Sequence, residues 1–332
     1  MTLESMIDCS RRHVSRAALL TVSLMTALMP AAQAQDYPSR AIRLIVPTGP
    51  GGGYDVFGRI VADQLNQKLG QAVVVENRTG AGTILGTKSV IDSQPDGYTL
   101  LAGGLSNIIF NARIYEKAPY DALKQLVPVA IIYKNSYAVV GSDKLPYKNV
   151  QELIAAAKSK PNSINLATAG VGTGQQLSAV AFMMETGTEF LQVPYKGATA
   201  VYPDLLSGRV DIFFDSTTGA LPFVKSGTAK ALAVLSSERS QDMPDVPTMT
   251  EAGVKGLEID AWLGIFAPAG TPKPVIEVLQ KAITASAPAL SEKFVAAGGS
   301  LMKVPADQLG GFVQSDFDRW SAVIKTAGIK LQ

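Results

Sequence analysis

The sequence predicts an α/β protein, because short apolar runs alternate with segments in which apolar residues recur at helical spacing. Glycine-rich turns follow several of the runs, as is typical where strands lead into helices. Strands that alternate with helices indicate βαβ units, whose sheets are mainly parallel and covered by helices on both faces. The expected strands occupy residues 41–47, 72–77, 98–104, 127–134, 137–143, 164–170, 191–197, 210–216, 231–237 and 263–269.

Helices are expected between many of these runs. After the first strand, Phe57, Val61 and Leu65 place apolar side chains on one helical face, so we expect Phe57 in the core. A final helix is expected from Leu309 to Ile324, docked on the first half of the fold. Similar patterns cover residues 150–158, 175–185, 201–206 and 274–283.

Two sheets are more plausible than one, because ten strands would make a large open sheet. The runs at 127–134 and 137–143 follow each other directly, which indicates a chain that passes from one sheet into another. The extended stretch from Gly256 to Gly270 would carry it back. We therefore expect a first lobe made of residues 35–135 and 260–332, a second lobe made of residues 136–259, and a ligand crevice between them.

The N-terminus has the pattern of a secretory signal peptide. Arg11, Arg12 and Arg16 precede an apolar run that is too short to cross a bilayer, which takes roughly 20 residues. We expect cleavage after Ala34 to remove residues 1–34 and leave the mature protein in the periplasm. The adjacent arginines leave both the Sec and the twin-arginine export routes open.

Removal of this segment would also take away Cys9 and His13, the only cysteine and the only histidine in the sequence. The remaining chain would have no disulfide, no Ser-His-Asp or Cys-His nucleophile system and no His/Cys zinc site. Its net charge would be about +1, because the removed segment carries three arginines and two acidic residues, Glu4 and Asp8, and so takes one positive charge from the formal +2. A nearly balanced charge argues against a nucleic-acid partner.

Three glycine-rich turns follow expected strands, at Ile45–Arg59, Asn77–Gly86 and Thr168–Leu177. Each would direct backbone N–H groups and a helix N-terminus at one point, which suits an anion. Chain reversal alone is the other explanation for each turn. Thr173 and Gln176 additionally have the spacing of a capping box, which is a structural reason for that pair.

Nucleotide motifs are absent from these turns. None contains the Gly-Lys pair of a Walker loop, so the sequence does not support nucleoside triphosphate binding. A dinucleotide fold is a closer alternative, because Glu76 ends the second strand where a ribose-binding acid belongs. The first loop lacks the G-x-G-x-x-G spacing, however, since Gly51, Gly52 and Gly53 are followed next by Gly58.

Several motifs together resemble one family. They are "YPSRAIRLIVPTGPGGGYDVFGR", "VVVENRTGAG", "PDGYTLL", "VPYKGATAVYPDLLSGRVDIFFD" and "VPTMTEAG…AWLGIFAPAGTPKPV", in this order from Tyr37 almost to the C-terminus. They are similar to the extracytoplasmic receptors of tripartite tricarboxylate transporters, the Bug family. The resemblance implies a two-lobed type II periplasmic binding fold that closes over a small organic carboxylate, aliphatic or aromatic. It also implies a monomer that delivers this ligand to a membrane permease, without enzymatic activity, cofactor or metal.

The resemblance also implies a set of ligand-binding residues. The first two turns would hold one carboxylate through backbone N–H groups, partly through water, which avoids the desolvation cost of a buried arginine. The second lobe would add hydroxyl, lysine and carboxylate groups. The expected residues are Pro50, Gly51, Gly52, Gly53, Tyr54, Asp55, Thr79, Gly80, Ala81, Gly82, Thr83, Thr168, Thr173, Tyr195, Lys196, Gly197, Asp215 and Ser216.

Two positions depart from the family pattern. Thr79 stands where relatives often have proline, and Gln176 stands where many have histidine, so the distal half of the ligand could differ from a typical dicarboxylate. Whether Tyr54 faces the ligand is left open, and Lys196 could equally be a surface lysine. A periplasmic sensor is an alternative to a transport receptor, and an exported oxidoreductase is a more remote one.

Overall fold

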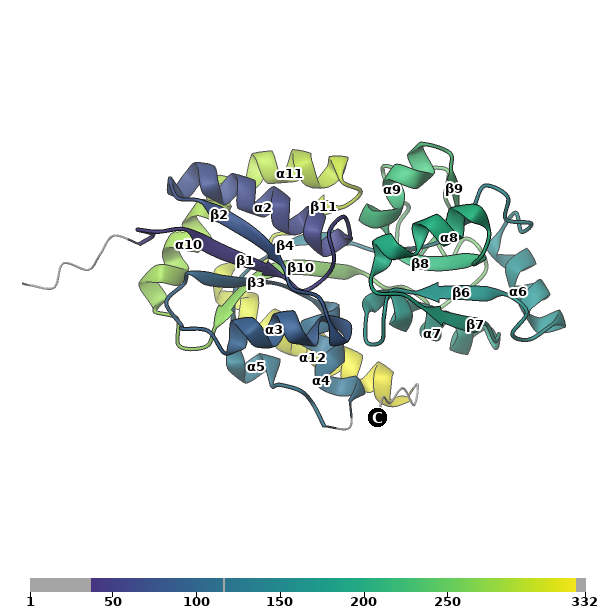
Figure 1. Cartoon of the computed structure of the whole chain (residues 1–332), viewed down its shortest axis with the longest axis horizontal. Coiled ribbons are helices and arrows are strands. Elements are labelled where there is room, and N and C mark those ends of the chain that lie inside the picture. The colour runs from purple at the N-terminus through teal and green to yellow at the C-terminus, as the bar shows by residue number, and fades with distance from the viewer. Residues whose placement is uncertain (1–36, 116, 327–332) are drawn as a thin grey trace, which may run out of the picture. The chain divides into compact units, whose positions relative to one another are not determined.

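The computed structural model describes residues 37–115 and 117–326, so the expected signal peptide and its cleavage site lie outside the described residues. The described chain forms two β-sheets (Figure 1). The first sheet has the order β11 (Ser300–Leu301), β4 (Leu126–Asn135), β10 (Ala261–Pro268), β3 (Thr99–Gly104), β1 (Ile42–Val46) and β2 (Val73–Asn77). The second has the order β7 (Leu191–Pro194), β6 (Asn165–Thr168), β8 (Ile212–Ser216), β5 (Tyr137–Ser142) and β9 (Ala229–Val234).

Helices cover both faces of each sheet, and single helical turns connect some elements (Figure 1). Around the first sheet these are α2 (Gly53–Leu69), α10 (Lys273–Ala285) and α11 (Ala287–Ala296) on one face, and α3 (Ile84–Ile91), α4 (Asn111–Ile114), α5 (Ala122–Gln125) and α12 (Leu309–Thr326) on the other. Around the second sheet they are α8 (Tyr202–Ser207) and α9 (Thr217–Lys225) on one face, and α6 (Val150–Ser159) and α7 (Gly174–Thr186) on the other. The single turns are η1 (Ala81–Thr83), η2 (Leu105–Phe110), η3 (Ala198–Ala200) and η4 (Ala306–Gln308).

This architecture confirms the α/β class and the division into two sheets, but strand pairing is mixed rather than mainly parallel. β1 runs parallel to β2 and β3, and β6 runs parallel to β7 and β8. The two strands that the chain enters after passing from one sheet to the other are antiparallel to their neighbours: β10 pairs with β3 and β4, and β5 pairs with β8 and β9. The reason is that β4 leads into β5 without an intervening helix, so β5 is not part of a βαβ unit.

Two crossover segments connect the sheets. The first is Ser136, between β4 and β5, and the second is the long connection from β9 to β10. A hydrogen bond joins them, because Ser136 Oγ donates to the carbonyl oxygen of Ile259 at 2.9 Å. We propose that the lobe boundaries lie at these segments, at residues 135/136 and 259/260, as expected from the sequence.

Aromatic side chains anchor the helices to the first sheet. The rings of Phe57 on α2, Tyr133 on β4 and Phe294 on α11 lie within 4.7–5.9 Å of one another, centroid to centroid. Phe57 is 1% exposed, which confirms the expectation that it belongs to the core. Large apolar side chains contribute roughly 1.5–3 kcal/mol each when fully buried, so this cluster fixes the position of the α2 N-terminus relative to the sheet.

Candidate functional site

The loop between β1 and α2 leaves the first N–H groups of the helix without a side-chain cap. The N-cap residue is Gly52, which has no side chain to accept a hydrogen bond. The N-terminus of a helix has unpaired N–H donors and about half a positive charge. This end of a 17-residue helix is therefore suited to hold an anion.

Asp55 organises the same loop from behind. Its Oδ2 accepts hydrogen bonds from the backbone N–H of Gly51 and from Nε of Arg59, both at 2.9 Å. Its Oδ1 accepts one from Asn77 Nδ2 at 2.8 Å. Burial alone would raise the pKa of Asp55, but these hydrogen bonds outweigh it, and the pKa lies below its usual value. Asp55 therefore positions the loop rather than facing the cavity.

Replacing Asp55 by asparagine is expected to lower the free energy of unfolding by about 2 kcal/mol. The side-chain NH₂ group of asparagine would take the place of one carboxylate oxygen, so a donor that now bonds to that oxygen would lose its acceptor. The lowered pKa gives this carboxylate a stabilising contribution above its unfolded pKa, which is lost as the pH falls through its folded pKa. Urea denaturation at pH 7 measures the change. Asp63→Asn, on the exposed side of the same helix, is the control, and equal losses in the two variants would contradict the positioning role.

The second glycine turn has a positive φ at four consecutive residues, from Gly80 to Thr83. Asn111 holds this turn: its Nδ2 donates to the carbonyl oxygen of Gly82 at 2.7 Å and to Oγ1 of Thr83 at 2.8 Å. A Cβ atom added at Gly82 would lie 1.9 Å from the carbonyl oxygen of Val171, on the loop after β6. Glycine at this position lets the turn approach the second sheet's loops closely.

Two hydrogen bonds also join loops that flank the two sheets. The backbone N–H of Gly174, at the start of α7, donates to Oγ of Ser106 at 2.9 Å. Thr199 Oγ1 donates to the carbonyl oxygen of Pro50 at 3.0 Å. These contacts show an arrangement in which the loops of the two sheets are closed on one another.

The third turn caps α7 and directs one side chain inward. Thr173 is the N-cap, and its Oγ1 accepts a hydrogen bond from the N–H of Gln176 at 3.4 Å. The Gln176 side chain turns back and accepts from the N–H of Gly172 at 2.9 Å, so this glutamine closes the turn. The preceding residue, Gln175, lines the cavity that is described next.

A small cavity of about 40 Å³ lies where these loops meet. No charged side chain lines it, and Thr48 Oγ1, on its wall, is buried without a hydrogen-bond partner. One water needs about 10–15 Å³ on this measure, so the cavity has room for a few waters. We call it the cleft cavity; its lining residues are Thr48, Gly49, Gly52, Gly53, Tyr54, Thr83, Ser106, Ala169, Thr173, Gln175, Gly197 and Ala198.

A second cavity of about 20 Å³ shares Gly53, Tyr54 and Gln175 with the first, and we call it the inner cavity. Tyr54 stands between the two: its hydroxyl donates to Asn107 Oδ1 at 3.3 Å, and burial raises its pKa. The other lining residues are Leu105, Asn135, Tyr137, Ser216, Ala261, Trp262 and Leu263. The inner cavity therefore has a largely apolar and aromatic wall.

The expected site residues fall into two groups. Those that line a cavity are Gly52, Gly53, Tyr54, Thr83, Thr173, Gly197 and Ser216. Those that line neither cavity are Pro50, Gly51, Asp55, Thr79, Gly80, Ala81, Gly82, Thr168, Tyr195, Lys196 and Asp215. Most of the second group shape or support the loops that the first group occupies.

Tyr195 and Lys196 do not line the cleft cavity. Tyr195 donates its hydroxyl hydrogen to Oδ2 of Asp204 at 2.7 Å, and Arg209 pairs with the other oxygen of the same carboxylate at 2.8 Å. Lys196 is exposed. A role of these two side chains in binding therefore stays a prediction.

Asp215, at the end of β8, is fully buried behind Gln175. Its Oδ2 accepts from the hydroxyl of Tyr202 at 2.7 Å, and its Oδ1 accepts from the N–H of Ser216 at 2.7 Å and from Gln175 Nε2 at 3.4 Å. Burial raises the pKa of Asp215 to about 6, although the hydrogen bonds from Tyr202, Ser216 and Gln175 oppose this. Because its amide nitrogen faces Asp215, Gln175 leaves its carbonyl oxygen for the cavity.

Sequence reasoning missed several lining residues, above all Thr48, Ser106 and Gln175. Thr48 and Ser106 follow the strands β1 and β3, whose carboxyl ends lie at one edge of the sheet. Ligands of open α/β sheets bind outside this edge, and that rule would have found both hydroxyls. The capping-box spacing of Thr173 and Gln176 is the one signal in the sequence that distinguishes Gln176 from Gln175.

Residues 57–329 match the family model described as the tripartite tricarboxylate transporter family receptor. The chain belongs to this family. Members are periplasmic binding proteins and not enzymes, which confirms the resemblance noted in the sequence.

Relatives match the receptor over almost its full length. BugT of Bordetella pertussis strain Tohama I is 35% identical over 319 residues, which cover 95% of this chain and 98% of the relative. The structure of the periplasmic binding protein BugD has a TM-score of 0.84 and 33% identity, covering 89% of this chain and all of that one. An R. palustris protein solved with adipate has a TM-score of 0.85 and 30% identity, covering 89% and 99%.

Two further observations concern the receptor's described residues. None of its described helices combines the length and the apolar character needed to span a bilayer. Within the same part of the chain, no three His, Cys, Asp or Glu side chains gather where a metal ion could be held.

Proposed function

We propose that this receptor captures a small organic carboxylate in the periplasm and delivers it to the permease of a tripartite tricarboxylate transporter. One observation carries the proposal: the uncapped N-terminus of α2 and the unpartnered hydroxyl of Thr48 meet at a cavity without charged side chains. N–H and hydroxyl donors stabilise a carboxylate there, and no arginine or lysine has to be desolvated.

Two similar proteins support the carboxylate class. One is the R. palustris protein with adipate, and the other is MatC from Rhodopseudomonas palustris with bound malate, 29% identical with a TM-score of 0.82. Both ligands carry the carboxylate group that the cleft cavity of this chain suits. We propose that the first carboxylate binds at Gly52, Gly53 and Thr48.

The rest of the ligand would lie toward the inner cavity. There the carbonyl oxygen of Gln175 accepts hydrogen bonds, and the buried Asp215 behind it disfavours a second negative charge. Tyr54, Tyr137 and Trp262 supply aromatic surface. These groups favour a ligand whose distal part is neutral, or has a hydroxyl or amino group that donates to Gln175.

Ligand entry requires the loops to separate. Cavities of about 40 and 20 Å³ are too small for a carboxylate of several carbon atoms, and the loops make direct hydrogen bonds across the entrance. We propose that the lobes move apart about the two crossover segments and close again on the ligand. A ligand shifts this equilibrium through its greater affinity for the closed form.

Thermal unfolding of the purified protein with a panel of carboxylates tests the binding function. A bound ligand at a hundredfold excess over its Kd adds about 2.7 kcal/mol of stability, so the melting temperature is expected to rise. The panel comprises adipate, malate, lactate and benzoate, and adipamide is the neutral control for adipate. Calorimetry of each positive compound is expected to give one-to-one binding.

An equal rise in melting temperature with adipate and adipamide would contradict carboxylate recognition, and so would the absence of any rise across the panel. The transport role has its own test, since permease subunits in proteoliposomes are expected to take up the bound carboxylate only when the receptor is added. Uptake that is independent of the receptor would contradict delivery while leaving ligand binding intact.

A further inference from the structure

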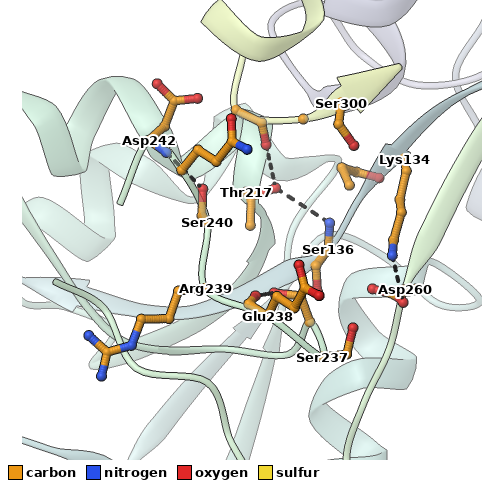
Figure 2. Close-up of a pocket in the computed structure, with 15 residues that line it drawn as sticks. Lys134, Ser136, Thr217, Ser237, Glu238, Arg239, Ser240, Asp242, Asp260 and Ser300 are labelled. Atoms are coloured by element: carbon orange, nitrogen blue, oxygen red, sulfur yellow. Dashed lines mark hydrogen bonds and ion pairs between the residues drawn. The ribbon is translucent and has the colours of Figure 1, made fainter. Parts of the chain in front are cut away.

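A separate pocket of about 180 Å³ lies at the crossover segments (Figure 2). We call it the hinge pocket. Its walls are the end of β4 with Ser136, the loop after β9 at residues 236–242, Asp260, and the turn at residues 298–300. It shares no lining residue with the cleft cavity and one, Asn135, with the inner cavity. Its volume is well above the roughly 10–15 Å³ that one water needs, so it has room for a small organic group.

Several hydrogen-bond donors of the pocket wall are already used. Arg239 points away from the other wall residues, and its Nε donates to Glu251 at 2.8 Å (Figure 2). Three hydroxyl groups each donate to a backbone carbonyl oxygen: Ser136 to Ile259 at 2.9 Å, Thr217 to Gly298 at 2.9 Å and Ser236 to Glu238 at 2.6 Å. The side chains of Ser237, Gln241 and Ser300 keep donors of their own, so the charge of the wall, rather than its donors, distinguishes one kind of occupant from another.

Acceptors remain available in the same pocket. The Glu238 carboxylate forms no ion pair or side-chain hydrogen bond within the described chain. Asp260 uses Oδ2 for Lys134 Nζ at 3.0 Å, while its Oδ1 is buried without a partner. The Lys134–Asp260 pair is neutral, and Arg239 and Asp242 are paired outside the pocket with Glu251 and Lys225. Glu238 therefore leaves one uncompensated negative charge.

This balance determines the chemistry of an occupant. A buried carboxylate oxygen without a donor costs free energy, which a hydrogen-bond donor would recover. Described acidic side chains do not gather in groups of three suited to a metal ion. We propose that the hinge pocket binds an organic cation, a guanidinium or primary ammonium group, whose N–H groups donate to the carboxylates of Glu238 and Asp260.

The two carboxylates come from different parts of the fold. Glu238 lies on the loop after β9 of the second sheet, whereas Asp260 precedes β10 and pairs with Lys134 on β4 of the first sheet. A cation that contacts both carboxylates would therefore connect the loop after β9 to the first sheet, at the crossover segments. The site is thus distinct from the carboxylate cleft in place and in the charge it prefers.

Titration of the whole purified protein with methylguanidinium chloride, followed by NMR, tests the site. Tetramethylammonium chloride is the control at equal ionic strength, because it carries the same charge without N–H donors. We expect saturable shifts with methylguanidinium and none with tetramethylammonium. Glu238→Gln is expected to weaken binding at least about tenfold, since hydrogen bonds to charged groups contribute roughly 1.5–3 kcal/mol. Glu292→Gln, an equal charge change on the exposed face of α11, is expected to leave binding unchanged.

Equal affinity of the unchanged chain and Glu238→Gln overturns the proposal, as does an equal response to the two cations or no saturable response to methylguanidinium. A second pair of probes separates the sources of the cation. Agmatine represents a free solute and carries no carboxylate for the cleft, and a capped Gly-Arg-Gly peptide represents the side chain of a partner protein. Tighter binding of either one supports the site and identifies the source, and failure of both to bind overturns it.

Discussion

Replacing Gly82 by alanine is expected to lower the affinity for the bound carboxylate at least about 100-fold, which corresponds to about 2.7 kcal/mol. The added Cβ would lie 1.9 Å from the carbonyl oxygen of Val171, and backbone at this distance has to move. The clash holds the second turn away from the loop after β6, so the closed arrangement cannot form. Gly82 contributes no side chain to the hydrophobic core, so circular dichroism is expected to show an unchanged fold.

Gly187→Ala is a matched control for this substitution. Gly187 ends α7 with φ +60°, close to the +57° of Gly82, and a Cβ there meets no atom within 4 Å. Both variants therefore carry similar left-handed strain, on the order of 1 kcal/mol, but only Gly82→Ala adds the clash. Calorimetric titration with the carboxylate that gives the largest thermal shift compares the two. Equal affinities would show that the contact between Gly82 and Val171 is not kept in the liganded state.

Gly52, in the first turn, differs from Gly82 in this respect. A Cβ added at Gly52 would come no closer than 3.8 Å to the carbonyl oxygen of Gly49, and its φ of −80° suits any residue. The sequence alone suggests that both glycines matter equally for binding. The structure instead attributes a steric requirement to Gly82 and, in the first turn, to Gly53, where an added Cβ would lie 2.9 Å from Oγ of Ser216.

Replacing Asp215 by asparagine is expected to remove a decline in stability between pH 4 and pH 6. Burial raises the pKa of Asp215 from 3.8 to about 6, so the folded state binds a proton in this range more tightly than the unfolded state. The carboxyl group's contribution is fully present below pH 3.8 and is lost as the pH rises through 6. Two pH units at about 1.36 kcal/mol each make this on the order of 3 kcal/mol.

Denaturation midpoints measured at half-unit steps from pH 4.5 to 7 check this expectation. The unchanged protein is expected to lose stability across the range, and Asp215→Asn is expected to give a flatter profile. Asp143→Asn, an exposed position just after β5, is the control and is expected to follow the unchanged protein. Parallel profiles for all three proteins would show that Asp215 does not titrate in this range.

The sequence predicts the sheets well because buried strands leave a direct apolar signal. All ten expected strands are present, and the added strand β11 has two residues, too few for a pattern. The helix α9 was not expected, since Gly219 and Pro222 lower helix propensity. Its Ser216 N-cap and its packing on β9 stabilise it, which are tertiary effects. The exact lobe boundaries stay a prediction.

The candidate site was predictable in location but less so in side chains. Glycine turns at the carboxyl ends of strands indicate where backbone donors gather. Sequence does not show, however, that the carboxylates of Asp55 and Asp215 turn away from the cavity to accept hydrogen bonds from their own loops. Nor does it show that Gln175 rather than Gln176 points inward, because that choice depends on the hydrogen bond between Gln176 and Gly172.

The uncapped N-terminus of α2 has a consequence for how such a receptor can diversify. Donors that belong to the main chain are present whatever the neighbouring side chains are, provided that the loop keeps its path. Asp55 secures that path from behind, with its hydrogen bonds to Gly51, Arg59 and Asn77. Substitutions around the inner cavity can therefore change which organic acid is bound, while the backbone donors that bind its carboxylate stay in place. Ligand preference and ligand retention can thus evolve separately.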